Sequence, residues 1–234
     1  NNILDFIKFR KAVAKRFYSY LKGLMTSNYK QAVNLTYWLN TYVSLLIRER
    51  SFKPSMNMNY KRGQIVYVNF GYRIGSEIGG SHYAIVLDVK SSKDNSSLTV
   101  LPLKSKRLKE TKYSKIYHYD LGDTFMRLVT NKVSNILTEQ THVLNSIVAK
   151  AQANPNDNDL IARLNVERDQ AQSKVKEAYE ILEFAQKLSH KSVADIGQIT
   201  TISKLRIIHP TKSHDILFNI CVSDKTLEDI SSQI

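Results

Sequence analysis

The stretch from Lys61 to Ser105 decides the fold of this chain. It reads KRGQIVYVNFGYRIGSEIGGSHYAIVLDV over residues 61–89 and, after a polar break, SLTVLPLKS over residues 97–105. Its runs of β-branched and aromatic residues predict three strands, with a glycine-rich loop between the first two. A histidine follows this loop, and a lysine and a serine end the third strand. This order predicts a small β-domain with polar groups near its strand ends.

The loop between Gly71 and Gly80 is a candidate phosphate-binding element. Glycines let a ligand approach the backbone closely, and bare amides in such a loop bind phosphate oxygens. A flexible hairpin connection is the alternative, because glycine loops are common. The candidate ligand groups of the loop are Arg73, Gly75, Ser76, Gly79 and Gly80, and Glu77 is a candidate partner for a proton-transfer group.

Three further residues are candidates for chemistry. Histidine gives or takes a proton near neutral pH, so His82 is the acid or base candidate. Lys104 and Ser105 end the third predicted strand, where they can hold a phosphate and offset added charge. A structural histidine and an ordinary basic strand end are the alternatives. Together the three residues favour chemistry on a nucleic acid backbone.

The charge of the chain favours a polyanionic partner. The 234 residues include 34 Lys and Arg against 21 Asp and Glu, which gives a formal net charge of +13. Such an excess favours nucleic acid or an anionic membrane as the partner. No apolar run approaches the roughly 20 residues needed to span a bilayer. We expect nucleic acid, and not a membrane, as the partner.

Cysteine usage and the N-terminal residues indicate a cytoplasmic protein. Cys221 is the single cysteine, so no internal disulfide is expected and a reducing compartment fits the sequence. Basic residues soon follow Ile3 and Leu4, which is unlike a signal peptide.

No metal or other cofactor is expected. His118 and Asp120 share a face of one predicted strand, and His214 and Asp215 lie in a turn, but neither pair supplies enough ligands at metal spacing. The segment GSEIGGS at 75–81 lacks the lysine and the helix start of a nucleotide-binding P-loop.

Helical periodicity flanks and interrupts the β-rich stretch. Residues 1–56 hold two apolar stripes separated near Ser27 and Asn28, a predicted N-cap, and predict a helical hairpin whose faces pack on each other and on something else. Residues 124–190 have a period near 3.5, broken at 154–158, and predict a long inserted antiparallel helical hairpin. We expect its seam to pair with itself; positioning RNA, blocking a site or dimerising are alternatives.

The last segment returns to strand-like composition and ends in a short helix after Ser223. The fold class is therefore α+β. We expect an N-terminal helical hairpin at 1–56, the first part of a β-domain at 57–123 and the inserted hairpin at 124–190. The second part of the β-domain and the C-terminal helix occupy 191–234. Strands on both sides of the insertion are expected to share one sheet.

Three segments together resemble the MazF/PemK family of toxin endoribonucleases. They are KRGQIVYVNFG at 61–71, IGSEIGGSHYAIVL at 74–87 and TVLPLKSK at 99–106. IGQITTISKLRI at 196–207 resembles the next signature of that family, a Gln-Ile-x-Thr-Ile run followed by a basic residue. The resemblance covers residues 60–121 and 193–234, with both helical hairpins outside it. It implies a small SH3-like β-barrel that cleaves single-stranded RNA without a metal.

The resemblance implies roles for the candidate residues. The family's Gly-Ser-Glu-x-Gly-Gly loop matches Gly75 to Gly80, and His82 occupies the position of the family's catalytic arginine. Lys104 replaces the threonine of the family's strand end, with Ser105 beside it. His82 would then transfer a proton, and Lys104 and Ser105 would bind the scissile phosphate with support from Arg73.

The reaction implied is attack of the ribose 2′-hydroxyl on the adjacent phosphorus. It gives a 2′,3′-cyclic phosphate and a 5′-hydroxyl. Lys106 and Arg107, which follow the third strand, are further RNA-binding candidates, and so are Thr201 and Lys204 of the later signature. A dimer interface, or a plain strand with outward polar residues, is the alternative for the latter pair.

The resemblance also implies a cytoplasmic toxin of a toxin–antitoxin system. Its partners would be single-stranded RNA, an antitoxin and, as is usual in the family, a second copy of the chain. The antitoxin would be a protein or, on the weaker ground of LysSerLysArg at 104–107, an RNA. Because His82 and Lys104 depart from the family pattern, a catalytically inactive barrel that binds RNA or protein is the alternative. A third interpretation makes the helical hairpins the interacting part and the barrel their scaffold.

Overall fold

A computed structural model describes residues 2–53, 55, 58–89, 92, 94–105, 116–187, 191–213, 215 and 217–234. It combines helices with an antiparallel sheet, in agreement with the expected α+β class. The chain divides into two compact units. The first contains Asn1–Phe52 and Phe70–Gly80, and the second contains Lys53–Asn69 and Ser81–Ile234.

Two consecutive helices make up most of the first unit. Helix α1 spans Ile3–Ser27 and helix α2 spans Tyr29–Glu49, so Asn28 alone separates them. The Asn28 side chain accepts a hydrogen bond from the Gln31 N–H at 3.1 Å, and the Asn28 N–H donates to the Leu24 carbonyl at 2.8 Å. Asn28 therefore ends α1 and caps α2, which confirms the predicted N-cap.

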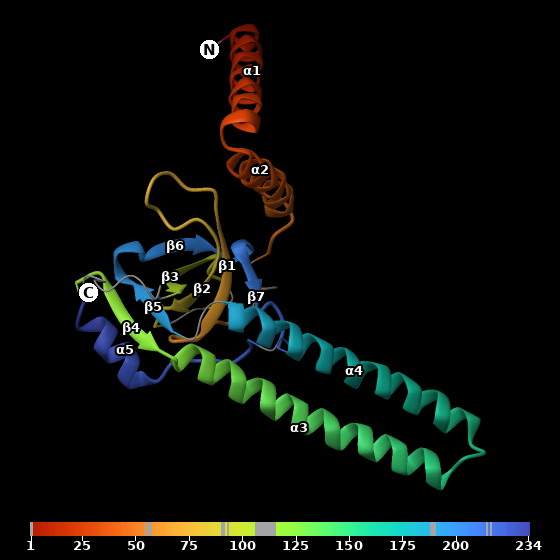
Figure 1. The fold of residues 1–234 in the computed structure, drawn as a ribbon. Coiled ribbons are helices and arrows are strands. Elements are labelled where there is room, and N and C mark those ends of the chain that lie inside the picture. Colours follow the sequence, from red (N-terminus) through yellow and green to blue (C-terminus); the bar gives the residue numbers. More distant parts are fainter. Residues whose placement is uncertain are drawn as a thin grey trace. The chain divides into compact units, whose positions relative to one another are not determined.

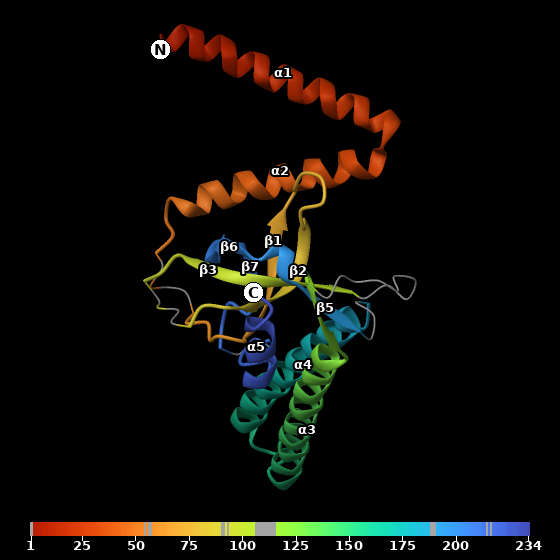
Figure 2. The ribbon, with the colours of Figure 1, turned by 90° about the vertical axis from the view of Figure 1, so that its left-hand side faces the viewer.

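The two helices pack together only near this junction. The buried cluster there consists of Leu24, Ala32 and Leu35, with Phe17, Leu21, Trp38 and Tyr72 against it. Away from the junction Ile3 is 72% exposed and Ile47 is 62% exposed, and Figure 2 shows the helices diverging. Both predicted helices form, but most of their apolar stripes do not pack on each other. A one-residue connection is shorter than the loops that return a helix antiparallel to its predecessor.

The segment from Phe70 to Gly80 packs on α2 within the same unit. Gly71 has φ +87°, and a Cβ atom there would lie 2.5 Å from the Trp38 ring. The Gln31 side chain donates a hydrogen bond from Nε2 to the Tyr72 hydroxyl at 2.6 Å. Glycine is therefore required at position 71 by both its backbone conformation and the adjacent indole.

The second unit is built on an antiparallel sheet. Its strands are β1 (Ile65–Gly71), β2 (Gly80–Val86), β3 (Ser97–Ser105), β4 (His118–Gly122), β5 (Ser192–Asp195), β6 (Thr200–Ser203) and β7 (Ile207–His209). The end residues of β1 and β2 belong to the first unit. Among the described residues the strand order is β4-β5-β3-β2-β1-β7, and β6 also pairs with β3. The path is open between β4 and β7, and closure into an SH3-like barrel stays a prediction.

Strand β3 lies at the centre of this sheet. On one side it pairs with β2, and on the other side with β5 near its end and β6 near its start. The short 3₁₀ helix Ile196–Gln198 separates β5 from β6. Because β5 and β6 follow the helical insertion in the chain, this pairing confirms that strands from both sides of the insertion share one sheet.

The insertion forms two long helices, α3 (Thr124–Ala153) and α4 (Asn158–Lys187). They lie side by side and antiparallel (Figure 1). The two helices bury small and branched residues at near-heptad spacing, which include Val129, Val133, Ile147, Leu164, Ala171 and Ala178, and α3 also buries Gln140. The predicted self-pairing of this hairpin therefore matches the structure.

One face of the sheet carries the main core of the second unit. Ile65, Ile85 and Leu101 are fully buried there, together with Phe125 and Val129 at the start of α3. The C-terminal helix α5 (Asp224–Ser231) adds its apolar face to this core. Ser223 is its N-cap, as predicted, and the Ser223 hydroxyl oxygen accepts the Thr226 N–H at 3.2 Å.

Candidate functional site

Lys104 lies in a three-residue charge cluster near the end of β3. Its Nζ forms an ion pair with Oδ2 of Asp195 on β5, and Nε2 of His118 on β4 lies 3.8 Å from Asp195 Oδ1. The sheet register explains the cluster. His118 is directly opposite Asp195, and Lys104 is opposite Val193, two residues before Asp195 on the same strand. Diagonal neighbours on one face are within reach of a lysine side chain.

The carboxylate of Asp195 is the buried member of this cluster. The Asp195 side chain is 5% exposed, whereas those of Lys104 and His118 are 34% and 20% exposed. A buried carboxylate is costly without partners, so Asp195 requires the contacts that Lys104 and His118 provide. The sequence analysis identified Lys104 but missed Asp195 as its partner.

His82 lies half-buried on β2, the neighbour of β3. Ala84 of β2 pairs with Pro102 of β3. Alternation along each strand then directs the side chains of His82 and Lys104 to the same face of the sheet. His82 and Lys104 must lie on the same face of the sheet if both are to contact one substrate.

Ser105 is directed differently from Lys104. Adjacent residues of a strand point to opposite faces, so the two side chains diverge along β3. A small cavity of about 10 Å³ is lined by Ser105 together with Tyr83, Phe125 and Ser192, and Lys104 also contributes to its wall. That space holds about one water. A phosphate bound by both Lys104 and Ser105 would therefore have to lie at the strand end.

The loop candidates form their own arrangement in the first unit. Arg73 Nη1 lies 3.6 Å from Glu77 Oε2, and Arg73 Nε donates to the Phe70 carbonyl at 3.2 Å. Both contacts favour the interpretation that Glu77 orders the loop. Gly75 and Gly80 have positive φ values of +63° and +81°, which favour glycine.

The remaining glycine and serine of the loop have different surroundings. A Cβ atom at Gly79 would lie 3.0 Å from the Gly71 carbonyl oxygen, so close backbone packing explains that glycine. Ser76 is exposed.

The RNA-binding candidates outside the loop divide into three groups. Thr201 is exposed on β6, opposite Thr99. Lys204 is 2% exposed, and its Nζ donates to the Ser92 carbonyl at 2.7 Å. Burial lowers the pKa of the Lys204 ammonium, against the opposing effect of Asp88 and Asp94. Lys204 therefore holds the chain before β3, which argues against contact with RNA. Lys106 and Arg107 lie outside the described residues.

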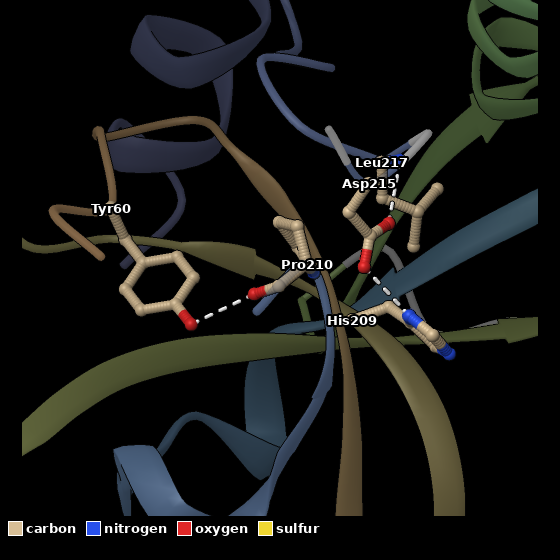
Figure 3. A network of polar contacts seen from close by, with 5 residues as sticks. All are labelled: Tyr60, His209, Pro210, Asp215 and Leu217. Carbon is tan, nitrogen blue, oxygen red and sulfur yellow. Dashed lines mark hydrogen bonds and ion pairs between the residues drawn. The ribbon is translucent and has the colours of Figure 1, made fainter. Parts of the chain in front are cut away.

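A second histidine–aspartate pair joins the end of β7 to the turn that follows it (Figure 3). His209 Nδ1 is 2.7 Å from Asp215 Oδ2, and Asp215 Oδ1 accepts the Leu217 N–H at 3.1 Å. The Tyr60 hydroxyl donates to the Pro210 carbonyl at 2.9 Å.

The hydrogen bond to Asp215 raises the pKa of His209, against the effect of burial. The sequence analysis noted Asp215 beside His214, which lies outside the described residues. It missed the contact with His209. This pair fastens the segment after β7.

Two properties of the described residues bear on cofactors and membranes. No three or more His, Cys, Asp or Glu side chains of the described segments lie in a group that could hold a metal ion. In the same segments, no helix has both the length and the apolar composition needed to cross a membrane.

The part of the chain that holds His82 and Lys104, residues 61–165, is similar to a family of toxins. A family model described as PemK-like, MazF-like toxin of type II toxin-antitoxin system matches residues 61–165. The resemblance seen in the sequence is thereby confirmed for the part that contains β1 to β4, including His82 and Lys104. The match also extends over α3 and the first residues of α4, which the sequence analysis had placed outside the resemblance. It does not include residues 193–234. No curated protein matches the chain.

Proposed function

We propose that this chain is a toxin-type endoribonuclease that cleaves single-stranded RNA, with mRNA as the target, without a metal. The observation that carries the proposal is the family match over residues 61–165, which contains the glycine loop, His82 and Lys104. The formal net charge of +13 supports a polyanionic substrate. The reaction is attack of the 2′-hydroxyl on phosphorus, which leaves 2′,3′-cyclic phosphate and 5′-hydroxyl ends.

The residues of the second unit have distinct roles in this proposal. His82 takes the proton of the 2′-hydroxyl, because histidine is a base near neutral pH. Lys104 contacts the scissile phosphate and offsets the charge that develops on it. The ion pair with Asp195 holds the lysine in place. Ser105 at the strand end supplies a hydroxyl for the same phosphate.

The proposal also assigns roles to the glycine-rich loop and to an antitoxin partner. Arg73 and the backbone amides from Gly75 to Gly80 contact RNA phosphates, and the Arg73–Glu77 ion pair orders them. The described class, a type II toxin, supports a protein antitoxin as the restraining partner. We further propose a cytoplasmic protein that acts as a homodimer.

The experiment is cleavage of a mixed single-stranded RNA by purified protein in the presence of EDTA. We expect discrete cuts with 5′-hydroxyl ends, and primer extension after induced expression should map the same cleavage sequence in cells. Lys104→Ala should lower cleavage about 10²- to 10³-fold, as removal of a charge-stabilising donor does. The proposal fails if folded wild-type protein leaves every RNA intact.

An inactive RNA- or protein-binding module is the second candidate function. The contact of Lys104 with Asp195 favours it, because a lysine already paired with a buried carboxylate is less available to a phosphate. The same RNA mixture distinguishes the candidates. Retention of uncut RNA, with salt-dependent affinity, supports the binding module.

A further inference from the structure

The Lys104–Asp195–His118 cluster places a second histidine beside the lysine assigned to the phosphate. His118 Nε2 lies 3.8 Å from Asp195 Oδ1, and Lys104 Nζ contacts the other oxygen of the same carboxylate. The imidazole of His118 and the ammonium of Lys104 are thus neighbours of the two oxygens of one carboxylate.

The exposure of the three side chains distinguishes the buried Asp195 from Lys104 and His118, which a substrate can reach. The Asp195 carboxylate is 5% exposed and negatively charged, so it is unsuited to touching an anionic substrate. Lys104 and His118 keep 34% and 20% of their side-chain surface exposed, on strands β3 and β4. Asp195 forms an ion pair with Lys104 and also lies near His118, at a distance longer than a hydrogen bond. A third group beside an acid or base commonly holds it in place.

Cleavage through a 2′-hydroxyl requires two proton transfers. One group takes the proton of the 2′-hydroxyl, and a second group protonates the 5′-oxygen as its bond to phosphorus breaks. The proposed function assigns the first transfer to His82 and leaves the second without a donor. An imidazolium is suited to the second transfer near neutral pH, whereas Lys104 contributes a fixed positive charge.

We infer that His118 is the general acid of this reaction and that Asp195 positions it; the inference rests on the RNA cleavage proposed above. The 2′-oxygen forms a bond to phosphorus while its proton passes to His82. The bond from phosphorus to the 5′-oxygen breaks, and the His118 imidazolium gives its proton to that oxygen. The products are a 2′,3′-cyclic phosphate and a 5′-hydroxyl, with His82 protonated and His118 neutral. Exchange with water restores both histidines.

The test compares two RNA substrates that differ in the leaving atom. One carries the natural 5′-oxygen at the mapped cleavage site, and the other carries a bridging 5′-sulfur, which leaves as a thiolate without protonation. His118→Ala should lose about 10²- to 10⁴-fold on the oxygen substrate, the usual contribution of an acid or base, and cut the sulfur substrate at nearly the wild-type rate. His118→Gln, which keeps a polar side chain at this half-buried position, is the second variant and should behave alike.

Two matched controls accompany these variants. His142→Ala removes an exposed histidine of α3 and should cut both substrates as the wild type does. Lys104→Ala should slow both substrates, because the phosphate contact is needed with either leaving atom. Asp195→Asn should slow both substrates, because Asp195 also holds Lys104, and should lose more on the oxygen substrate than on the sulfur substrate if it also acts through His118.

The outcomes separate this inference from the proposed function. If the wild type cuts both substrates, and the folded His118 variants cut the oxygen substrate at the wild-type rate or lose both substrates equally, only the role of His118 is overturned. If the folded wild type cuts neither substrate, the ribonuclease proposal fails and the role of His118 fails with it. Equal melting temperatures of the variants and the wild type establish that folding is intact.

Discussion

Two histidine–aspartate pairs in the second unit have the same side chains and different surroundings. His209 and Asp215 are near neighbours in sequence, and their 2.7 Å contact is joined by the Leu217 N–H, a buried backbone group. His118 and Asp195 come from separate strands, and their carboxylate also holds Lys104. The first pair fastens a turn, and the second lies beside a cation suited to phosphate. The comparison teaches that the same two side chains can make a purely local contact or share their carboxylate with a cation, and the proposed chemistry rests on the second arrangement.

The same substitution in both aspartates should separate the pairs most strongly. Asp195→Asn removes the charge that orients Lys104 and His118, and we expect RNA cleavage to fall about 10²-fold, the cost of a small misplacement of catalytic groups. Asp215→Asn should leave the cleavage rate of the folded protein unchanged. Initial rates on one RNA substrate, measured well below the melting temperatures, test both. Equal losses for the two variants would remove the distinction.

Loss of the Asp215 carboxylate should lower the stability of the protein. Asp215→Ala leaves the N–H of buried Leu217 without its acceptor, and we expect the free energy of unfolding to fall by about 1–3 kcal/mol. Asp169→Ala, on an exposed ion pair with Arg168, is the matched control and should change it by less than about 0.5 kcal/mol. Urea unfolding measures both. A loss at Asp215 no larger than that of the control would contradict the fastening role.

The pH dependence of stability is the smallest expected effect. The folded pKa of His209 is raised, chiefly by its hydrogen bond to Asp215. Its stabilisation is therefore fully present below the unfolded value of about 6.5 and is lost as the pH rises through the folded pKa. Because His209 is 45% exposed, we expect less than about 1 kcal/mol. His209→Gln should remove this slope in urea unfolding; an unchanged slope would assign it to other groups.

Local sequence patterns predicted the elements of this fold well. Alternating and β-branched residues indicated β1 to β3, and heptad spacing with a break at 154–158 indicated α3 and α4. These features depend on neighbouring residues, which a sequence shows directly. The angle between α1 and α2 was not predicted from the sequence, because it depends on the backbone conformation of the single connecting residue, Asn28.

The candidate site was only partly accessible to sequence analysis. Lys104 and His82 were identifiable because a family pattern surrounds them. His118 was noted only with Asp120, and Asp195 was not noted, since pairing of β4 with β5 across the helical insertion is what brings His118 and Asp195 together. Lys204 has the composition of an RNA contact, but its burial is decided by residues distant in sequence.

The helical insertion leaves from β4 and returns to β5, and these two strands are paired neighbours. Each of its helices has 30 residues and extends about 45 Å. Removing the same number of heptads from both helices would shorten this arm while leaving its two anchoring strands in register. The length of the helical arm can therefore be changed without changing the geometry around Asp195.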